Sequence, residues 1–79
     1  MNDIVFKASE GRMLYYNYIP EGLVDFPGEI VVDHVNLELE NVRLSEKDID
    51  GYYAKKAVEY ILNRIERWSV PVHFTQIWF

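Results

Sequence analysis

Two histidines, His34 and His73, are the side chains best suited to metal binding, because the sequence contains no cysteine. A metal site would need both imidazole rings together with Asp33 or a glutamate. Neither an H-x-H nor an H-E-x-x-H spacing is present to support such a site. We therefore expect His34 in a half-exposed bulge and His73 on a strand, each hydrogen-bonded to backbone or water.

Acid–base chemistry would require paired carboxylates, and Glu38 and Glu40 are the candidates. On one strand they would point to the same side, about 6.5–7 Å apart, which is within the range of catalytic pairs. Such a pair also needs a deep cleft, and 79 residues leave little volume for one beside the core. Ser69, His73 and a carboxylate have no spacing that marks a nucleophile. We therefore expect no enzyme, no cofactor and no metal, with a small metal-dependent or acid–base enzyme as an alternative.

Acidic side chains are concentrated in one part of the chain. The net charge is −5, and residues 29–50 carry seven acidic and two basic side chains. An acidic strip attracts a basic protein and raises its association rate, whereas it disfavours binding to a phosphate backbone. Ordinary solubility charge combined with helix capping is the alternative interpretation. The predicted strip consists of Asp33, Glu38, Glu40, Asp48 and Asp50.

Aromatic side chains give a second candidate surface, where Tyr16 and Tyr18 share one face of a predicted hairpin with Leu14. Sheet-borne aromatic rings bind single-stranded nucleic acid in several small folds, but this face has only Lys7 and Arg12 as basic residues. Tyrosine is also enriched in protein interfaces, so a protein partner or a second copy of the chain is favoured over nucleic acid. The predicted outer face consists of Val5, Leu14, Tyr16, Tyr18, Ile77 and Phe79.

This outer face depends on a hairpin over residues 4–19 with its turn at Glu10-Gly11. Glycine adopts the positive φ that a tight turn requires, and this turn pairs Phe6 with Tyr15. Side chains alternate across a strand, so the opposite face becomes the core face. The predicted core face consists of Ile4, Phe6, Ala8, Met13, Tyr15 and Ile19.

Residues 29–44 form the third strand region, in which the phase of the apolar residues changes twice. Bulges near Asp33-His34 and near Asn41 would restore the phase, because one extra residue re-aims the side chains. Two shorter strands joined at Asp33-His34 are the alternative.

A helix is predicted over residues 49–68, because the apolar residues there recur at helical spacing. A capping box over residues 45–48, or Asp48 or Asp50 alone, would start this helix, and Pro71 would stop it. Residues 72–79 form the last strand, which we place beside the first strand in an order such as 3-2-1-4. A strand–helix–strand crossover returns parallel to the strand it left, and two apolar faces suit an interior position.

The sequence therefore predicts a single α+β domain over residues 1–79, a two-layer β-β-β-α-β fold with the helix on one sheet face. We expect a cytoplasmic protein without a membrane partner, because neither a signal peptide nor a bilayer-spanning apolar run is evident. The predicted function is a non-catalytic, acidic protein-binding module, comparable in size and charge to inhibitors, antitoxins and immunity factors, or a self-associating protein. A single-stranded nucleic-acid binder is the remaining alternative.

Overall fold

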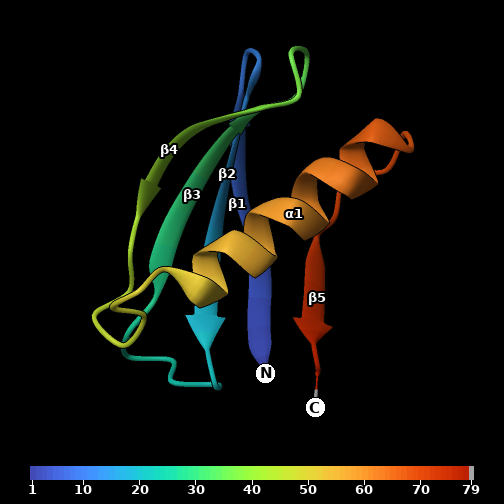
Figure 1. Cartoon of the computed structure of the whole chain (residues 1–79). Coiled ribbons are helices and arrows are strands. Elements are labelled where there is room, and N and C mark those ends of the chain that lie inside the picture. The colour runs from blue at the N-terminus through green and yellow to red at the C-terminus, as the bar shows by residue number, and fades with distance from the viewer. Residues whose placement is uncertain (79) are drawn as a thin grey trace.

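The computed structural model describes residues 1–78 and contains one sheet with one helix lying across it (Figure 1). The elements are β1 (Asn2–Glu10), β2 (Met13–Pro20), β3 (Gly28–Asp33), β4 (Glu38–Arg43), α1 (Tyr52–Glu66) and β5 (His73–Gln76). All neighbouring strands are antiparallel, in the order β4-β3-β2-β1-β5. The predicted α+β class is confirmed, but the sheet has five strands instead of four.

The β1–β2 hairpin differs from the prediction by a small change of register with a large effect. Its turn residues lie between Glu10 and Met13, and the extra residue Lys7 forms a bulge, after which Phe6 pairs with Tyr16. The predicted pairing of Phe6 with Tyr15 is therefore wrong. A shift by one residue moves every side chain of a strand to the other face. The core face of β2 accordingly carries Leu14, Tyr16 and Tyr18, which are all buried.

The predicted third strand is two strands, as the alternative interpretation proposed. Residues 34–37 form the turn between β3 and β4, and Asp33 accepts hydrogen bonds from the backbone N–H groups of Val35 (2.9 Å) and Asn36 (3.0 Å). The bulge expected near Asn41 is confirmed, because Glu40 is left without a partner between the Val31–Asn41 and Val32–Leu39 pairs.

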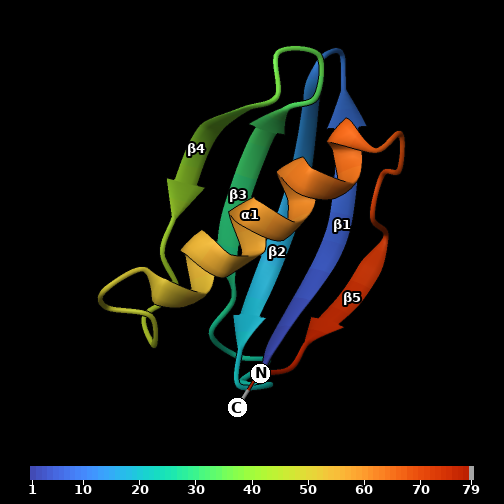
Figure 2. The ribbon, with the colours of Figure 1, turned by 45° about the vertical axis from the view of Figure 1, so that its right-hand side comes forward.

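Helix α1 is shorter than the predicted helix at both ends. It runs diagonally across the sheet from the β4 side to the β5 side (Figure 2). The predicted capping box does not form. Asp48, which was one of the predicted alternatives, accepts hydrogen bonds from the first turn at the N–H groups of Tyr53 (3.0 Å) and Ala54 (2.9 Å), although Gly51 is the residue that directly precedes the helix. The core between helix and sheet consists of Ile4, Leu14, Tyr16, Tyr18, Ile30, Val32, Ala54, Ala57 and Ile61.

Strand β5 lies beside β1, as predicted, and runs in the same direction as β4, the strand that precedes the helix. It is an edge strand and not the interior strand that its two apolar faces suggested. One face is covered by α1, because the ring of Phe74 stacks on Tyr60 with 4.2 Å between ring centroids. The other face, which includes Thr75 opposite Asp3, lies on the uncovered side of the sheet.

Candidate protein-binding groove

The predicted tyrosine surface does not exist in the folded chain. Tyr16 is 1% exposed and Tyr18 0% exposed, and Leu14 is buried beside them. The Tyr16 hydroxyl donates to the Pro71 carbonyl (2.8 Å), and burial raises the pKa of this hydroxyl to about 12. An aromatic platform for nucleic-acid bases is therefore absent at Tyr16 and Tyr18. Of the other predicted members, Val5 is half-buried, Ile77 is exposed and Phe79 lies outside the described residues.

The predicted acidic strip is not one surface either. Asp33 and Asp48 are 2% and 1% exposed, and only Glu38, Glu40 and Asp50 are exposed. Asp33 holds the β3–β4 turn, while Asp48 and Asp50 lie near the start of α1 at the opposite end of β4 (Figure 1). The two buried carboxylates therefore stabilise the fold, and three exposed acidic side chains remain available to a partner.

Acid is expected to weaken the turn that Asp33 holds. The hydrogen bond from the Asn36 backbone N–H, followed by that from Val35, lowers the pKa of Asp33. Because this pKa is lower in the folded than in the unfolded chain, the stabilising contribution is present above the ordinary aspartate pKa and lost as pH falls below it. Urea midpoints between about pH 7 and about pH 3 should fall less steeply for Asp33→Asn than for wild type. Asp25→Asn, in an exposed loop, is the control that should keep the wild-type slope.

The start of α1 is tied to the sheet by a buried polar cluster. Asp48 accepts from the Tyr18 hydroxyl (2.7 Å), and this hydroxyl in turn accepts from the Ser45 N–H (2.9 Å). Burial is the main reason that the pKa of Tyr18 is raised. Through these bonds Tyr18 joins β2 to the segment that precedes the helix.

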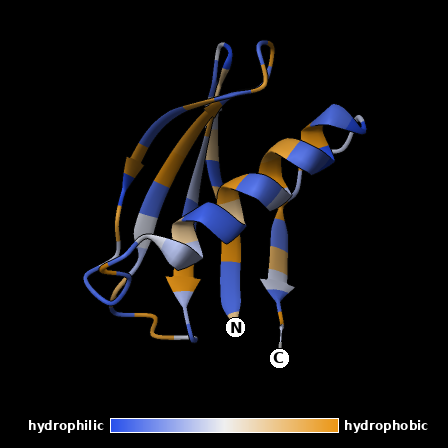
Figure 3. Ribbon diagram, viewed as in Figure 1, coloured by the Kyte–Doolittle hydropathy of each residue, from blue (hydrophilic) through white to orange (hydrophobic). Residues whose placement is uncertain are grey.

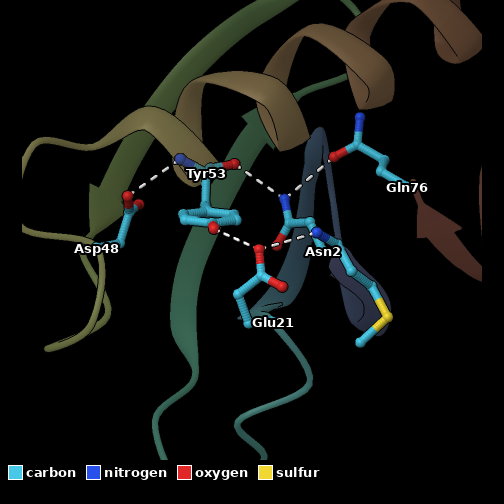
Figure 4. A network of polar contacts seen from close by, with 6 residues as sticks. Asn2, Glu21, Asp48, Tyr53 and Gln76 are labelled. Atoms are coloured by element: carbon cyan, nitrogen blue, oxygen red, sulfur yellow. Dashed lines mark hydrogen bonds and ion pairs between the residues drawn. The ribbon is translucent and has the colours of Figure 1, made fainter. Parts of the chain in front are cut away.

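A second polar network, next to the first, fixes the N-terminus of the chain (Figure 4). The Tyr53 hydroxyl donates to Glu21, which also pairs with the terminal ammonium at 3.0 Å. The hydrogen bond between Tyr53 and Glu21 raises the pKa of Tyr53 to about 12 and lowers the pKa of Glu21. The Asn2 amide donates to the Tyr53 carbonyl (3.0 Å) and to Gln76 (3.1 Å). This network joins β1, α1 and β5, so its hydrogen bonds stabilise the fold.

The two histidines do not converge. His34 follows β3 and lies 3.4 Å from the Gly11 carbonyl oxygen, whereas His73 starts β5 and lies 3.8 Å from Asp3. Strands β1 and β2 separate them. Within residues 1–78, no group of three or more histidine, aspartate or glutamate side chains is arranged to hold a metal ion.

Exposed apolar side chains lie beside α1 along β4 and at the residue that follows this strand. All six residues of β4 are exposed, and Leu39 (44%), Val42 (36%) and Leu44 (41%) stand beside the helix. They face Ala54 and Val58 across a groove of about 300 Å³. Figure 3 shows hydrophobic segments in both β4 and α1. We call this feature the groove, lined by Leu39, Val42, Leu44, Gly51, Ala54, Lys55, Val58 and Glu59.

The bulge at Glu40 is the physical reason for the groove. Leu39 and Val42 are three residues apart, so a regular strand would place them on opposite faces. Their partners Val32 and Ile30 are both core residues, which puts both side chains on the helix side. The phase change in the sequence was the signal for this arrangement. The exposure of these side chains was not predicted, since alternation does not reveal how far a helix extends over a sheet.

Strand β4 is also an edge of the sheet, with β3 as its single neighbour. An edge strand has backbone N–H and C=O groups that point outward without a partner strand. The fold and the groove together define a small two-layer α+β domain with an open edge strand beside an apolar helix–strand groove. Comparisons with protein-family models, with curated proteins and with solved structures find no match. Helix α1, the one helix in the described part of the chain, lacks the length and apolarity to cross a bilayer.

Proposed function

We propose that this protein is a non-catalytic protein-binding module, and that the groove receives an extended segment of a partner protein. The observation that carries the proposal is that Leu39 and Val42 on the open edge strand β4, and Leu44 directly after it, are exposed next to α1. Addition of a strand to a sheet edge gives affinity through main-chain hydrogen bonds and specificity through pockets for alternate side chains. The edge of β4 supplies the main-chain groups for these hydrogen bonds, and the groove supplies a pocket for side chains.

The side chains of an added strand would alternate between the two faces of the sheet. Those on the helix side would enter the groove and cover Leu39 and Val42, which removes apolar surface from water. Those on the other side would lie near Arg43 and Glu29, which are already paired at 3.2 Å. The partner segment is therefore expected to carry apolar residues at every second position.

Charge around the groove favours a basic partner. Glu59 on α1 is an exposed residue of the lining, Glu38 and Glu40 are exposed on β4, and Lys55 is the basic residue of the lining. Charged side chains at an interface rim mainly raise the association rate and select the partner. Together with the net charge of −5, these acidic side chains favour a module that blocks a basic protein, as inhibitors, antitoxins and immunity factors do.

Selection from a displayed peptide library tests the proposal without knowledge of the natural partner. We expect selected peptides to alternate apolar with polar residues and to carry lysine or arginine. Val42→Glu should weaken their binding at least about tenfold, because it puts a charge on the wall of the groove. Val24→Glu is the matched control, because Val24 is exposed in the β2–β3 loop.

Two results would contradict the proposed site. One is equal loss of peptide binding in Val42→Glu and Val24→Glu. The other is selection of acidic peptides that bind both variants as well as wild type. A thermal melt of each variant shows that the fold is retained, since both positions are exposed.

A further inference from the structure

Trp68 stands at a position that disfavours its side chain. It follows the last turn of α1 with φ +65°. Its backbone N–H donates to the Ile65 carbonyl (2.9 Å), and the backbone N–H of Ser69 donates to the Arg64 carbonyl (3.0 Å). These two bonds make a Schellman motif, in which the left-handed residue is usually glycine because a Cβ is strained there. The indole is 98% exposed, so burial in this chain does not compensate for that strain.

Leu37 also combines a left-handed backbone conformation with an exposed apolar side chain. It lies in the β3–β4 turn with φ +57° and is 41% exposed. Both residues line one hollow of about 470 Å³ between this turn and the end of α1. We call this feature the hollow, lined by His34, Val35, Leu37, Ile65, Glu66, Trp68, Ser69 and Val70. Two large apolar side chains held in strained conformations around one hollow indicate a requirement other than folding.

We propose that a second copy of this chain fills the hollow, with the Trp68 indole of each copy seated in the hollow of the other. An interface around a two-fold axis uses the same patch on both copies, so that patch must contain both the inserted group and its receptor. Here the exposed indole and the apolar hollow lie side by side. Tryptophan is also the residue type most often found as an energetic centre of protein interfaces.

Exposed side chains of both charges lie near the hollow. The α1 end carries Arg64 and Arg67, with Glu66 between them, and the strand that follows Leu37 carries Glu38 and Glu40. A two-fold rotation that exchanges Trp68 side chains also brings the arginine side of one copy toward the glutamate side of the other. Such complementarity fixes the orientation of two partners. The hollow and the groove have no lining residue in common, because the groove lies along the first half of α1 and the hollow at its end.

Sedimentation equilibrium from micromolar to millimolar concentration tests this proposal. We expect wild type to form a dimer, and Trp68→Gly to remain monomeric with a higher melting temperature, because glycine fits the left-handed position. Leu37→Asn should also weaken the dimer without lowering the melting temperature, since asparagine tolerates this conformation. Ile49→Glu, 91% exposed near the start of α1, is the control that should leave the dimer intact.

Tryptophan fluorescence gives a second readout. In Trp78→Phe, the remaining indole is Trp68, and its emission should shift to shorter wavelength as concentration rises. A monomer at every concentration would overturn the proposal, and so would a dimer that Trp68→Gly leaves unchanged. Val42→Glu in the groove should leave the dimer intact, so failure of this proposal is distinguishable from failure of the proposed function.

Discussion

Asp48→Ala is expected to lower the free energy of unfolding by about 3 kcal/mol or more. The carboxylate is 1% exposed and accepts three hydrogen bonds, from the Tyr18 hydroxyl and from the N–H groups of Tyr53 and Ala54. Alanine would leave these two helix N–H groups and the buried Tyr18 hydroxyl without the carboxylate that accepts their hydrogen bonds. Each buried donor that loses its acceptor lowers the stability of the fold. Urea denaturation at neutral pH measures the loss.

Asp50→Ala is the matched control for this substitution. Asp50 is exposed and accepts one hydrogen bond, from the Tyr52 N–H at 3.1 Å. Its removal should cost about 1 kcal/mol or less, as for an exposed helix cap. Equal losses in Asp48→Ala and Asp50→Ala would contradict the assignment of Asp48 as the residue that ties α1 to β2.

Ile61→Asp is expected to abolish cooperative folding. Ile61 is 0% exposed at the centre of the helix–sheet core, so aspartate would bury an unpaired charge and remove apolar contacts. The combined loss, of about 4 kcal/mol or more, is comparable to the whole stability of a domain this small. Circular dichroism should record no cooperative melt.

Asn63→Asp places the same side chain on the exposed side of α1 and should melt cooperatively near the wild-type temperature. A cooperative melt of Ile61→Asp would show that this face of the helix does not pack on the sheet.

The helix was predictable because its signal is local. Its apolar stripe repeats within one segment, and tertiary contacts at Ala54, Ala57 and Ile61 follow that stripe. Its end was less predictable. The predicted helix extended to Trp68, but the left-handed conformation of that residue ends the helix earlier and leaves the indole in solvent.

The faces of β2 were not predictable from alternation alone. Both parities contain apolar and aromatic residues, so the bulge at Lys7 decides which set is buried, and nothing in the sequence marks it. The hydroxyl partners of Tyr16 and Tyr18 are Pro71 and Asp48, which lie 55 and 30 residues away. Contacts this distant in sequence cannot be inferred from local patterns.

The acidic strip failed for a related reason. Charged residues are rarely buried unless they are paired, so Asp33 and Asp48 were assigned to the surface. Their partners are backbone N–H groups of the next turn and of the helix start, and these donors exist only once the chain has folded. The phase change at Glu40, by contrast, was visible, and it is the feature that forms the groove.

Amide hydrogen exchange of β4 tests the central claim most directly. A library-selected peptide is added to the protein, and exchange is followed for residues 38–43 and, as an internal control, for the other edge strand β5. We predict that the outward-facing amides of β4 exchange more slowly with the peptide bound, while those of β5 are unchanged, because main-chain hydrogen bonds form at the added strand. Protection of β5 or of the uncovered sheet face, with β4 unchanged, would contradict the groove as the binding site.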